Sequence, residues 1–505
     1  ELYDYLSNRF TPGGLVNFVE NNFIEVLTSD KEYLDDIITS ATEEIESAFG
    51  EGYWADHFTY ILDLAETYEG MYPDKMKHLL FKENDIKTFD SPIYVLPKDG
   101  KAVINSENNI RQYGSILEFD DEKIKRLNMN PYGSNWAKLG DETYQTNLYT
   151  KLLILALNKH SNLDPDLIGI EMESNKPGWN DAMNGVPGLF GSGVSESIEL
   201  LRIVEFLLAH LPQESIDIPI ELYLLFKHLE ESKTYIDILS TREQYRASTR
   251  FGLSHEFKTI YATRLQVYLE TLRNHITSKI DMLYEENDGI IPTFLVYEVT
   301  DFEEILDEHG NRVIGNYNMP LVHPKNYKRR NLPNFLEAPA RLLKTNYNKE
   351  KLHNMFEKIK ASGIYDETLK MYKTSDNLDI ETVEIGRVRA FTKGWLERES
   401  NFLHMTYKYL LGLLRAGLYE EYYNELEDNL VCFMDPEVYK RSTLENSSFI
   451  APSNNPNKNI HGQGFFARLS GSTAETINMW MIMMTGGNPF RLVDGNLVFS
   501  IEPKL

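Results

Sequence analysis

Residues 195–211 read SESIELLRIVEFLLAHL, and this stretch is the clearest guide to the fold class. Its apolar side chains recur every three or four residues, at Ile198, Leu201, Val204 and Leu207, which is the spacing of one helix face. The same period predicts further helices over 13–29, 30–48, 143–158, 215–230, 256–284, 335–345, 349–361, 399–415, 418–429 and 472–484. About a dozen paired helices are typical of an α/α toroid or barrel, and an α-solenoid has the same period.

Strand signals are fewer and shorter. Phe490–Val493 and Leu497–Ile501 flank Asp494-Gly495, which predicts a hairpin near the end of the chain. Because a lone hairpin is marginally stable, we expect it to belong to a larger β module. Long polar segments separate the helices and are expected to be functional loops: 86–140, 172–194, 300–332 and 446–472.

Composition narrows the classes of partner. The 505 residues carry a formal net charge of −26, which argues against a nucleic-acid binder and against an anionic membrane surface. A neutral substrate, or a small anion in a locally cationic pocket, fits better. The single cysteine, Cys432, excludes an intrachain disulfide and a thiolate metal cluster. No apolar run reaches the roughly 18 residues of a membrane span, so we expect a cytoplasmic protein.

The first candidate for chemistry is Lys176-Pro-Gly-Trp-Asn-Asp-Ala-Met-Asn-Gly185. Glycine and proline place Trp179 and Asp181 on a loop. An indole ring stacks on a sugar face, and an apolar neighbour keeps a carboxyl group protonated so that it can act as an acid. An Asn-Asp turn anchored by a buried tryptophan explains the same residues equally well.

Two further segments suggest an anion site. His461-Gly-Gln-Gly464 precedes Arg468-Leu-Ser-Gly-Ser-Thr-Ala474, where backbone N–H groups at a helix start could bind an anion. Simple N-capping by Ser or Thr is the alternative. His404, at the start of a predicted helix and near acidic residues, could donate to an anion, although a structural histidine is the commoner case.

Two other clusters are weaker. Gly50-Glu-Gly-Tyr-Trp-Ala-Asp-His57 interleaves aromatic and polar residues, and Asn109-Ile-Arg-Gln-Tyr113 contains Arg111. Each taken alone is better explained by structure than by function. His57 with Asp56 has the spacing of metal ligands, but no convincing third ligand lies near, so we expect no metal and no cofactor.

Together, these segments resemble the inverting β-glucoside phosphorylases, the cellobiose/chitobiose phosphorylase family and its β-1,3-glucan phosphorylase relatives. The resemblance covers roughly residues 45 to 500 and rests mainly on the Trp-Asn-Asp motif together with the Ser-Gly-Ser-Thr-Ala segment. Supporting matches are Gly188-Leu-Phe-Gly191, Glu445-Asn-Ser-Ser-Phe-Ile450, Phe49–His57 and Asn334-Phe-Leu-Glu-Ala-Pro339.

The resemblance implies a mainly α fold built on an (α/α)6 barrel. Residues 1–48 would be a helical linker or the start of the barrel, 49–487 the catalytic barrel, and 488–505 the start of a truncated C-terminal jelly roll. The family's N-terminal β-sandwich has no counterpart in this sequence. Since that domain often carries dimer contacts, the resemblance allows a homodimer.

The resemblance also implies phosphorolysis, in which inorganic phosphate, a co-substrate, attacks a β-glucoside and releases α-glucose 1-phosphate. Asp181 would be the general acid. His404, Ser470 and Gly471 would bind phosphate. The family's phosphate-binding arginine follows a Gly-Tyr pair, but here Trp54 follows Gly52-Tyr53, so the arginine is unassigned. Arg111 is our preferred substitute, ahead of Lys176 and His461. The expected sugar ligands are Trp179, Asn180, Asp56, Glu399, Trp54 and Gln463.

Two other functions stay open at this point. An inverting hydrolase would need a second carboxylate to activate water, and Glu399 or Asp56 is the candidate. A non-catalytic sugar-binding subunit would bind glucan without turnover. The sequence does not fix the glucosidic linkage or the chain length of the β-glucan or β-gluco-oligosaccharide.

Overall fold

The computed structural model describes residues 2–42, 55–117, 119–131, 135–173, 178–467 and 470–504. The chain divides into two compact units. The first is Glu1–Ala48 with Asn130–Asn135, and the second is Phe49–Met129 with Trp136–Leu505.

The first unit contains three short helices, α1 (Leu2–Leu6), α2 (Pro12–Asn21) and α3 (Asp30–Ser40). Proline at the first position of α2 and a capping box between Ser29 and Glu32 at α3 set where the two helices begin. The helix predicted over 13–29 ends earlier, because the chain leaves helical geometry near Phe23, whose φ is 53°. Leu15 and Val19 form the buried face of α2.

The second unit carries most of the helices. They are α4 (Ala55–Met71), α5 (Met76–Phe81), α6 (Asp121–Leu127), α7 (Leu148–His160), α8 (Val194–Ala209), α9 (Ile220–Glu231), α10 (Tyr235–Thr249), α11 (Ala262–Glu286), α12 (Glu337–Leu342), α13 (Lys349–Lys360), α14 (Leu403–Arg415), α15 (Tyr419–Asn429), α16 (Pro436–Tyr439) and α17 (Ser470–Thr485).

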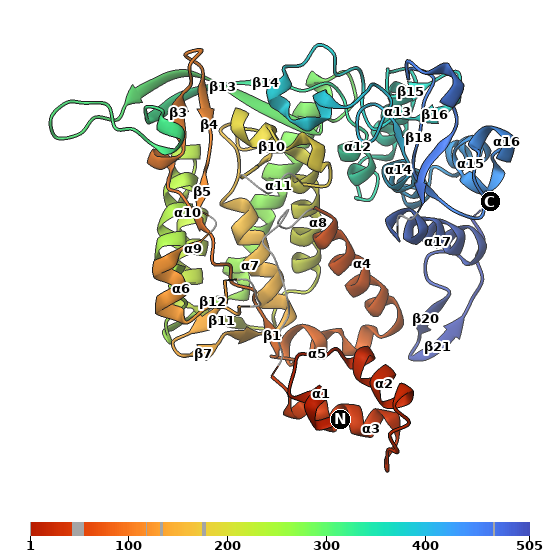
Figure 1. Ribbon diagram of the computed structural model, residues 1–505, viewed down its shortest axis with the longest axis horizontal. Helices are drawn as coiled ribbons and strands as arrows, with labels where there is room; N and C mark the ends of the chain where they lie inside the picture. The colour runs from red at the N-terminus through yellow and green to blue at the C-terminus, as the bar shows by residue number, and fades with distance from the viewer. Residues whose placement is uncertain are drawn as a thin grey trace. The chain divides into compact units, whose positions relative to one another are not determined.

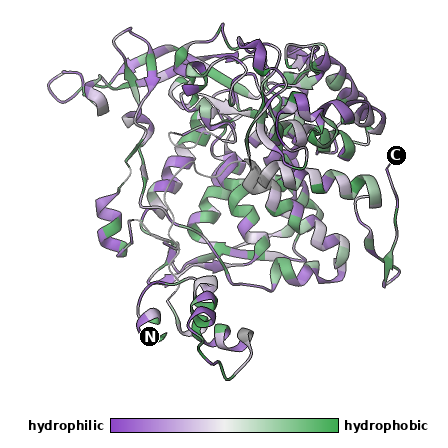
Figure 2. Cartoon of the chain, turned by 45° about the vertical axis from the view of Figure 1, so that its right-hand side comes forward, coloured by the Kyte–Doolittle hydropathy of each residue, from purple (hydrophilic) through white to green (hydrophobic). Residues whose placement is uncertain are grey.

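Two helices organise the packing of this unit. Helix α8 packs against α4, α7, α11 and α12, while α14 packs against α12, α15 and α17 (Figure 1). Both α8 and α14 are buried along most of their length, and their leucines join one large apolar core. Figure 2 shows many hydrophobic residues on the helices at the centre of the view and many hydrophilic residues toward its edges. None of the described helices has the length and apolarity needed to cross a membrane.

The prediction of a mainly α protein with an (α/α)6 barrel is wrong. Helices hold 46% of the residues and strands 18%, and the strands form many small antiparallel sheets between the helices. The described residues therefore do not form a clean barrel of paired helices. Helical periodicity revealed most of the long helices, but it carries no signal for three-residue strands such as Ala102–Ile104 and Ile110–Gln112, which lie in the segment 86–140 that the sequence assigns mainly to a polar loop.

Most strands are short. They are β1 (Ile86–Lys87), β2 (Tyr94–Val95), β3 (Ala102–Ile104), β4 (Ile110–Gln112), β5 (Ile116–Leu117), β6 (Lys138–Leu139), β7 (Glu142–Thr143), β8 (Gln145–Thr146), β9 (Ile170–Glu171), β10 (Ser192–Gly193), β11 (Ser215–Pro219), β12 (Phe257–Tyr261), β13 (Phe294–Glu304), β14 (Val322–Asn331), β15 (Tyr365–Asp366), β16 (Met371–Tyr372), β17 (Asn401–Phe402), β18 (Ser447–Ile450), β19 (Gly464–Ala467), β20 (Phe490–Val493) and β21 (Asn496–Phe499).

The longest strands correct a second expectation. The segment 300–332, predicted to be a polar loop, contains much of the hairpin β13–β14, which pairs from Leu295↔Asn331 to Glu304↔Val322. The hairpin extends the sheet β14-β13-β10-β9. Between β9 and β10 the chain makes the long excursion that contains the Trp-Asn-Asp motif, so a sheet edge and α8 anchor both ends of that loop.

A second sheet brings distant segments together. Strand β18 pairs with β17 on one side and with β19 on the other. Strand β17 leads directly into α14, and β19 ends shortly before α17. The starts of α14 and α17, which carry His404 and Gly471, are therefore held close to each other.

The predicted C-terminal hairpin is confirmed. Strands β20 and β21 pair from Phe490↔Phe499 to Val493↔Asn496. Asp494 and Gly495 both have positive φ, 50° and 77°, as the tight turn of such a hairpin requires. The larger β module expected around it stays a prediction.

Candidate active site

The acid loop, residues 178–191, holds Asp181 at the start of a short 3₁₀ turn, Asp181–Met183. Ala182 and Met183 are fully buried in a small apolar cluster with Phe294 and Phe335, which fixes the turn against the β13–β14 sheet. The Asp181 side chain keeps 27% of its surface exposed. A carboxyl group on an anchored loop with partial access to solvent is a suitable proton donor.

Asp181 forms an ion pair with Arg387. Arg387 opens the 3₁₀ turn Arg387–Ala390, and its backbone N–H donates to Oδ1 of Asn184, at 3.0 Å. Gly386 permits this close approach, since a Cβ there would lie 2.6 Å from the same oxygen and φ is 126°. Sequence reasoning missed Arg387. The only signal was a pair of arginines after a glycine in a strongly acidic chain.

Trp179 connects the acid loop to α14. Its indole Nε1–H donates to Nδ1 of His404 at 3.2 Å, and its ring meets the edge of Phe402. Because the indole nitrogen can only donate, Nδ1 must accept, and a neutral His404 then carries its proton on Nε2. The structure therefore brings together Trp179 and His404, which the sequence proposed for different roles.

The backbone of Gly471 lies against the His404 ring, at the first turn of α17. A Cβ on Gly471 would lie only 2.5 Å from Nε2 of His404, so a larger residue would displace the ring. The first turn of a helix offers backbone N–H groups that have no partner within the helix. The His404 ring and the start of α17 therefore lie against each other. Ser470 is in this turn, but its side chain falls outside what the structure describes.

A polar group that includes the buried side chains of Lys408 and Glu475 lies beside His404. Nε2 is 3.4 Å from the Tyr60 hydroxyl and 4.0 Å from Oε1 of Glu475. Lys408 donates to the same Glu475 oxygen at 3.0 Å. Burial would raise the pKa of Glu475, but Lys408 and Lys344 hold it below its ordinary value. These contacts fix the orientation of the imidazole ring.

Asn180 has an unusual environment for an amide. Its side chain is 1% exposed, and neither its nitrogen nor its oxygen has a hydrogen-bond partner among the described residues. Buried amides are nearly always paired, because an unpaired group costs about 1–3 kcal/mol. Asn180 therefore offers both a donor and an acceptor beside Asp181.

Glu397 is a second carboxyl group close to Asp181. Burial raises the pKa of Glu397, and the charge of Asp181 raises it further. Glu399, which the sequence favoured, has a different setting. It is 1% exposed, and its two oxygens accept from the Leu378 N–H at 3.1 Å and from Asn454 Nδ2 at 3.0 Å. Both oxygens of the Glu399 carboxylate thus accept hydrogen bonds from the protein itself rather than facing an open site.

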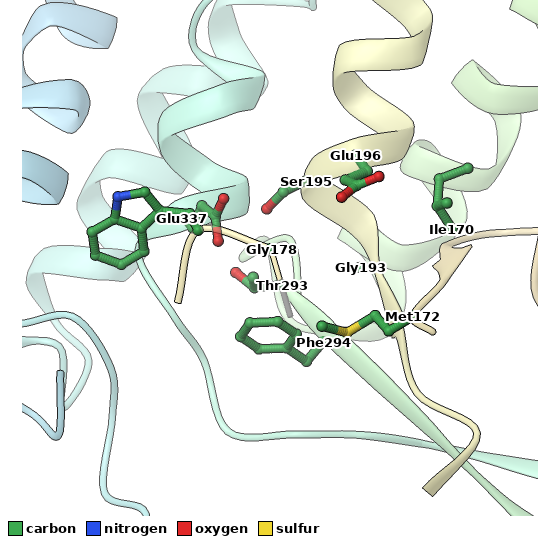
Figure 3. A pocket seen from close by; sticks show the side chains of 10 residues that line it. Ile170, Met172, Gly178, Gly193, Ser195, Glu196, Thr293, Phe294 and Glu337 are labelled. Atoms are coloured by element: carbon green, nitrogen blue, oxygen red, sulfur yellow. The ribbon is translucent and has the colours of Figure 1, made fainter. Parts of the chain in front are cut away.

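A small pocket adjoins Trp179 and has about 20 Å³ of space open to a water-sized molecule (Figure 3). The Ser195 hydroxyl and the Glu337 carboxylate line it, with Thr293 between them in the view. The Ser195 oxygen is buried and has no partner within the described ranges. This pocket could accept a hydroxyl group or a water molecule.

The other predicted phosphate and sugar ligands have contacts elsewhere. Arg111 pairs through two nitrogens with Glu384, at 2.8 and 2.7 Å. Nε2 of His461 contacts the Asn455 carbonyl at 2.7 Å, and Gln463 donates to the Asn459 carbonyl at 2.7 Å. All three side chains are engaged by neighbouring groups, and none of these hydrogen bonds reaches Trp179 or His404.

Three further predicted residues lack a full description. Trp54 and Lys176 lie outside the described residues, and Asp56 lies in the first turn of α4 with its side chain undescribed. Within the described ranges, no group of three or more His, Cys, Asp or Glu side chains is placed to hold a metal ion. The expectation of a metal-free, cofactor-free site stays a prediction.

Comparison with known proteins adds no family. No known family model matches the chain, and no curated protein matches it either. The functional argument therefore depends on the site and on the motifs.

Proposed function

We propose that this chain catalyses inverting phosphorolysis of a β-linked gluco-oligosaccharide or glucan, releasing α-glucose 1-phosphate, with Asp181 as the general acid. The observation that carries the proposal is the hydrogen bond from Trp179 Nε1 to His404 Nδ1. It joins the loop that presents the acid to the histidine and helix start that suit a phosphate. The motif resemblance to the β-glucoside phosphorylases is independent support.

Phosphate would bind where His404 and α17 meet. The Nε2–H of His404 would be one donor, and the first backbone N–H groups of α17, where Gly471 lies against the same ring, would supply others. Because phosphate is itself a nucleophile, the reaction needs no general base to activate water. One carboxylic acid is then sufficient for catalysis.

Asp181 would protonate the departing glycosidic oxygen, so it must be neutral before the step. The ion pair with Arg387 therefore has to open first. Arg387 is half-exposed and free to move toward an incoming phosphate, whose charge exceeds that of a carboxylate. In this scheme phosphate binding draws Arg387 away, the released Asp181 carboxylate takes up a proton from water, and the sugar ring lies between Asn180 and Trp179.

An inverting hydrolase is the second candidate, and Glu397 is the observation that favours it. Two carboxyl groups near each other, one with a raised pKa, is the arrangement of an acid and a base. Glu397 would then protonate the leaving group while Asp181 activates water. This version requires no phosphate, which separates it from the first.

Three finer expectations remain part of the proposal. A cytoplasmic location, a homodimer and the absence of a cofactor all stay predictions. The glucosidic linkage is open because no described residue selects among acceptors.

The reverse reaction tests the proposal. The chain is incubated with α-glucose 1-phosphate and a panel of β-1,2, β-1,3 and β-1,4 acceptors, and inorganic phosphate release is measured. Phosphate release that depends on one acceptor class supports phosphorolysis and identifies the linkage. If no acceptor releases phosphate while β-glucans are hydrolysed, the hydrolase replaces it.

A further inference from the structure

Five charged side chains meet inside the second unit, away from the Asp181–Arg387 pair. We call this set, Lys101, Glu171, Glu173, Arg242 and Arg246, the Arg242 cluster. Lys101 Nζ contacts both oxygens of Glu173, at 2.8 and 3.0 Å, and Arg246 contacts the first of them at 3.1 Å. Arg242 contacts Glu171 at 2.6 Å. Three cations thus share two carboxylates, which leaves one positive charge uncompensated within the cluster.

Most of the cluster lies in the interior, although the Arg246 side chain is 28% exposed. Lys101 and Glu173 are each 4% exposed, and Arg242 is 3% exposed. Burial lowers the pKa of both Lys101 and Arg246, and Glu173 compensates only in part. An uncompensated buried charge is costly in a medium of low polarity, because the charge has lost its hydration. An added negative charge would therefore be stabilised here.

A small pocket, with about 30 Å³ of space open to a water-sized molecule, adjoins this cluster. Its lining includes three cations, Lys98, Lys101 and Arg242, and one carboxylate, Glu171. The Glu171 carboxylate is already engaged, since it accepts from Arg242 and, at 2.5 Å, from the Tyr235 hydroxyl. The walls are partly aromatic, and the remaining polar lining residues are Gln112 and His323.

One donor of Arg242, a residue that lines this pocket, has no acceptor among the described residues. The Nε–H of Arg242 is buried and has no hydrogen-bond partner among the described residues, although the other end of the guanidinium is paired. A water molecule would satisfy the hydrogen bond but would leave the charge uncompensated. An oxyanion would supply both the acceptor and the missing charge.

We propose that this pocket binds a small oxyanion, a carboxylate or a phosphate, with the Arg242 Nε–H as donor and Lys98 and Lys101 as counter-charges. This site is separate from the one formed by His404 and Gly471, and the inference does not depend on the proposed function. Strand β9 carries Glu171, and the chain continues from it toward the acid loop.

Binding is measured on the whole chain by thermal unfolding and by calorimetric titration. Sodium acetate and sodium phosphate are each compared with sodium chloride at equal ionic strength, in the wild type and in the variant His404→Ala. We expect saturable stabilisation by at least one oxyanion that persists in His404→Ala. Persistence with acetate alone identifies a carboxylate site, and persistence with phosphate alone identifies a phosphate site.

Variants then test the location. Arg242→Gln should weaken oxyanion binding at least about tenfold. Lys98→Met should weaken it by about threefold, and because Lys98 is only half-buried the folded protein should tolerate this substitution. Arg264→Gln is the matched control, since Arg264 pairs with Glu230 outside the pocket. No saturable stabilisation beyond sodium chloride would overturn the inference. So would binding that Lys98→Met and Arg242→Gln both leave unchanged.

Discussion

Two arginine–carboxylate pairs meet in one short stretch of chain, and they differ in how completely each is satisfied. Glu384 receives two nitrogens of Arg111 at 2.8 and 2.7 Å, and the Tyr113 hydroxyl at 3.2 Å. Three residues later, Arg387 makes an ion pair with Asp181. The side chains of Arg111 and Glu384 are 17% and 29% exposed, whereas that of Arg387 is 50% exposed.

This difference in exposure and in the number of hydrogen bonds indicates that the Arg111–Glu384 pair is structural and that the Arg387–Asp181 pair can open. A bidentate pair with a third donor fixes the geometry of both partners, and moving either side chain breaks several bonds. An ion pair with an exposed arginine can open at low cost, because water replaces the lost contact. Arg387 is therefore better suited than Arg111 to exchange a carboxylate for a substrate phosphate.

The largest effect is expected for Asp181→Asn. The amide cannot deliver a proton, so turnover should fall by at least about 10²-fold while glucan binding persists. Initial rates and glucan affinity measure the two effects separately. Near-normal rates in this variant would show that Asp181 is not the acid and would shift attention to Glu397.

The next effect concerns the phosphate half of the site. His404→Ala removes the Nε2–H donor, and we expect the KM for phosphate to rise about 10- to 100-fold with a smaller change for the glucan. The matched control is His461→Ala, whose imidazole contacts a backbone carbonyl in its own loop. Equal effects of the two substitutions would contradict the role given to His404.

Arg387→Ala sharpens the comparison directly. If Arg387 passes from Asp181 to phosphate, the variant should raise the KM for phosphate by about tenfold. Arg389→Ala is the control. Arg389 lies two residues after Arg387 in the same turn, and its Nε–H donates to the Glu381 carbonyl. An unchanged phosphate KM in Arg387→Ala would make its contact with Asp181 purely structural.

Arg111→Ala should lower stability and leave the KM for phosphate nearly unchanged, the opposite of what we expect for Arg387→Ala. Removing this guanidinium leaves Glu384 without its main partner, so we expect a loss of about 1 kcal/mol in unfolding free energy and less than a threefold change in phosphate KM. Urea unfolding and steady-state kinetics measure both. A large kinetic effect with little loss of stability would restore Arg111 as the phosphate ligand.

The smallest effect is a pH dependence of stability. The hydrogen bond from Arg111 is the main reason that the pKa of Glu384 lies below its ordinary value of 4.5. A lowered folded-state pKa stabilises the protein above pH 4.5, and this stabilisation is lost as the pH falls through the folded-state value. The difference in unfolding free energy between wild type and Arg111→Ala should therefore narrow from pH 7 to pH 4. A constant difference would show that the pair does not act through charge.

Sequence patterns predicted local structure better than they predicted contacts. Amphipathic periodicity located α8, α13 and α15 closely, and the Asp494-Gly495 turn located the last hairpin. It missed α10, whose polar sequence has little apolar periodicity, and it missed β14, which was assigned to a loop. The barrel was wrong because short strands between helices leave no periodic signal.

The candidate site shows the same limit. Trp179, His404 and Gly471 were each visible as motif residues, and the sheet β17-β18-β19 explains why two of them meet. The ion pair between Asp181 and Arg387 joins residues 206 positions apart. No spacing rule connects such residues, and the same is true of Arg111 and Glu384.

Product analysis in the forward direction tests the central claim most directly. Wild type and Asp181→Asn are incubated with a β-glucan panel, each with and without inorganic phosphate, and sugar 1-phosphate and free glucose are quantified. Phosphorolysis with Asp181 as the acid predicts α-glucose 1-phosphate from the wild type only when phosphate is present, and little from the variant. Free glucose that forms equally with and without phosphate would contradict it.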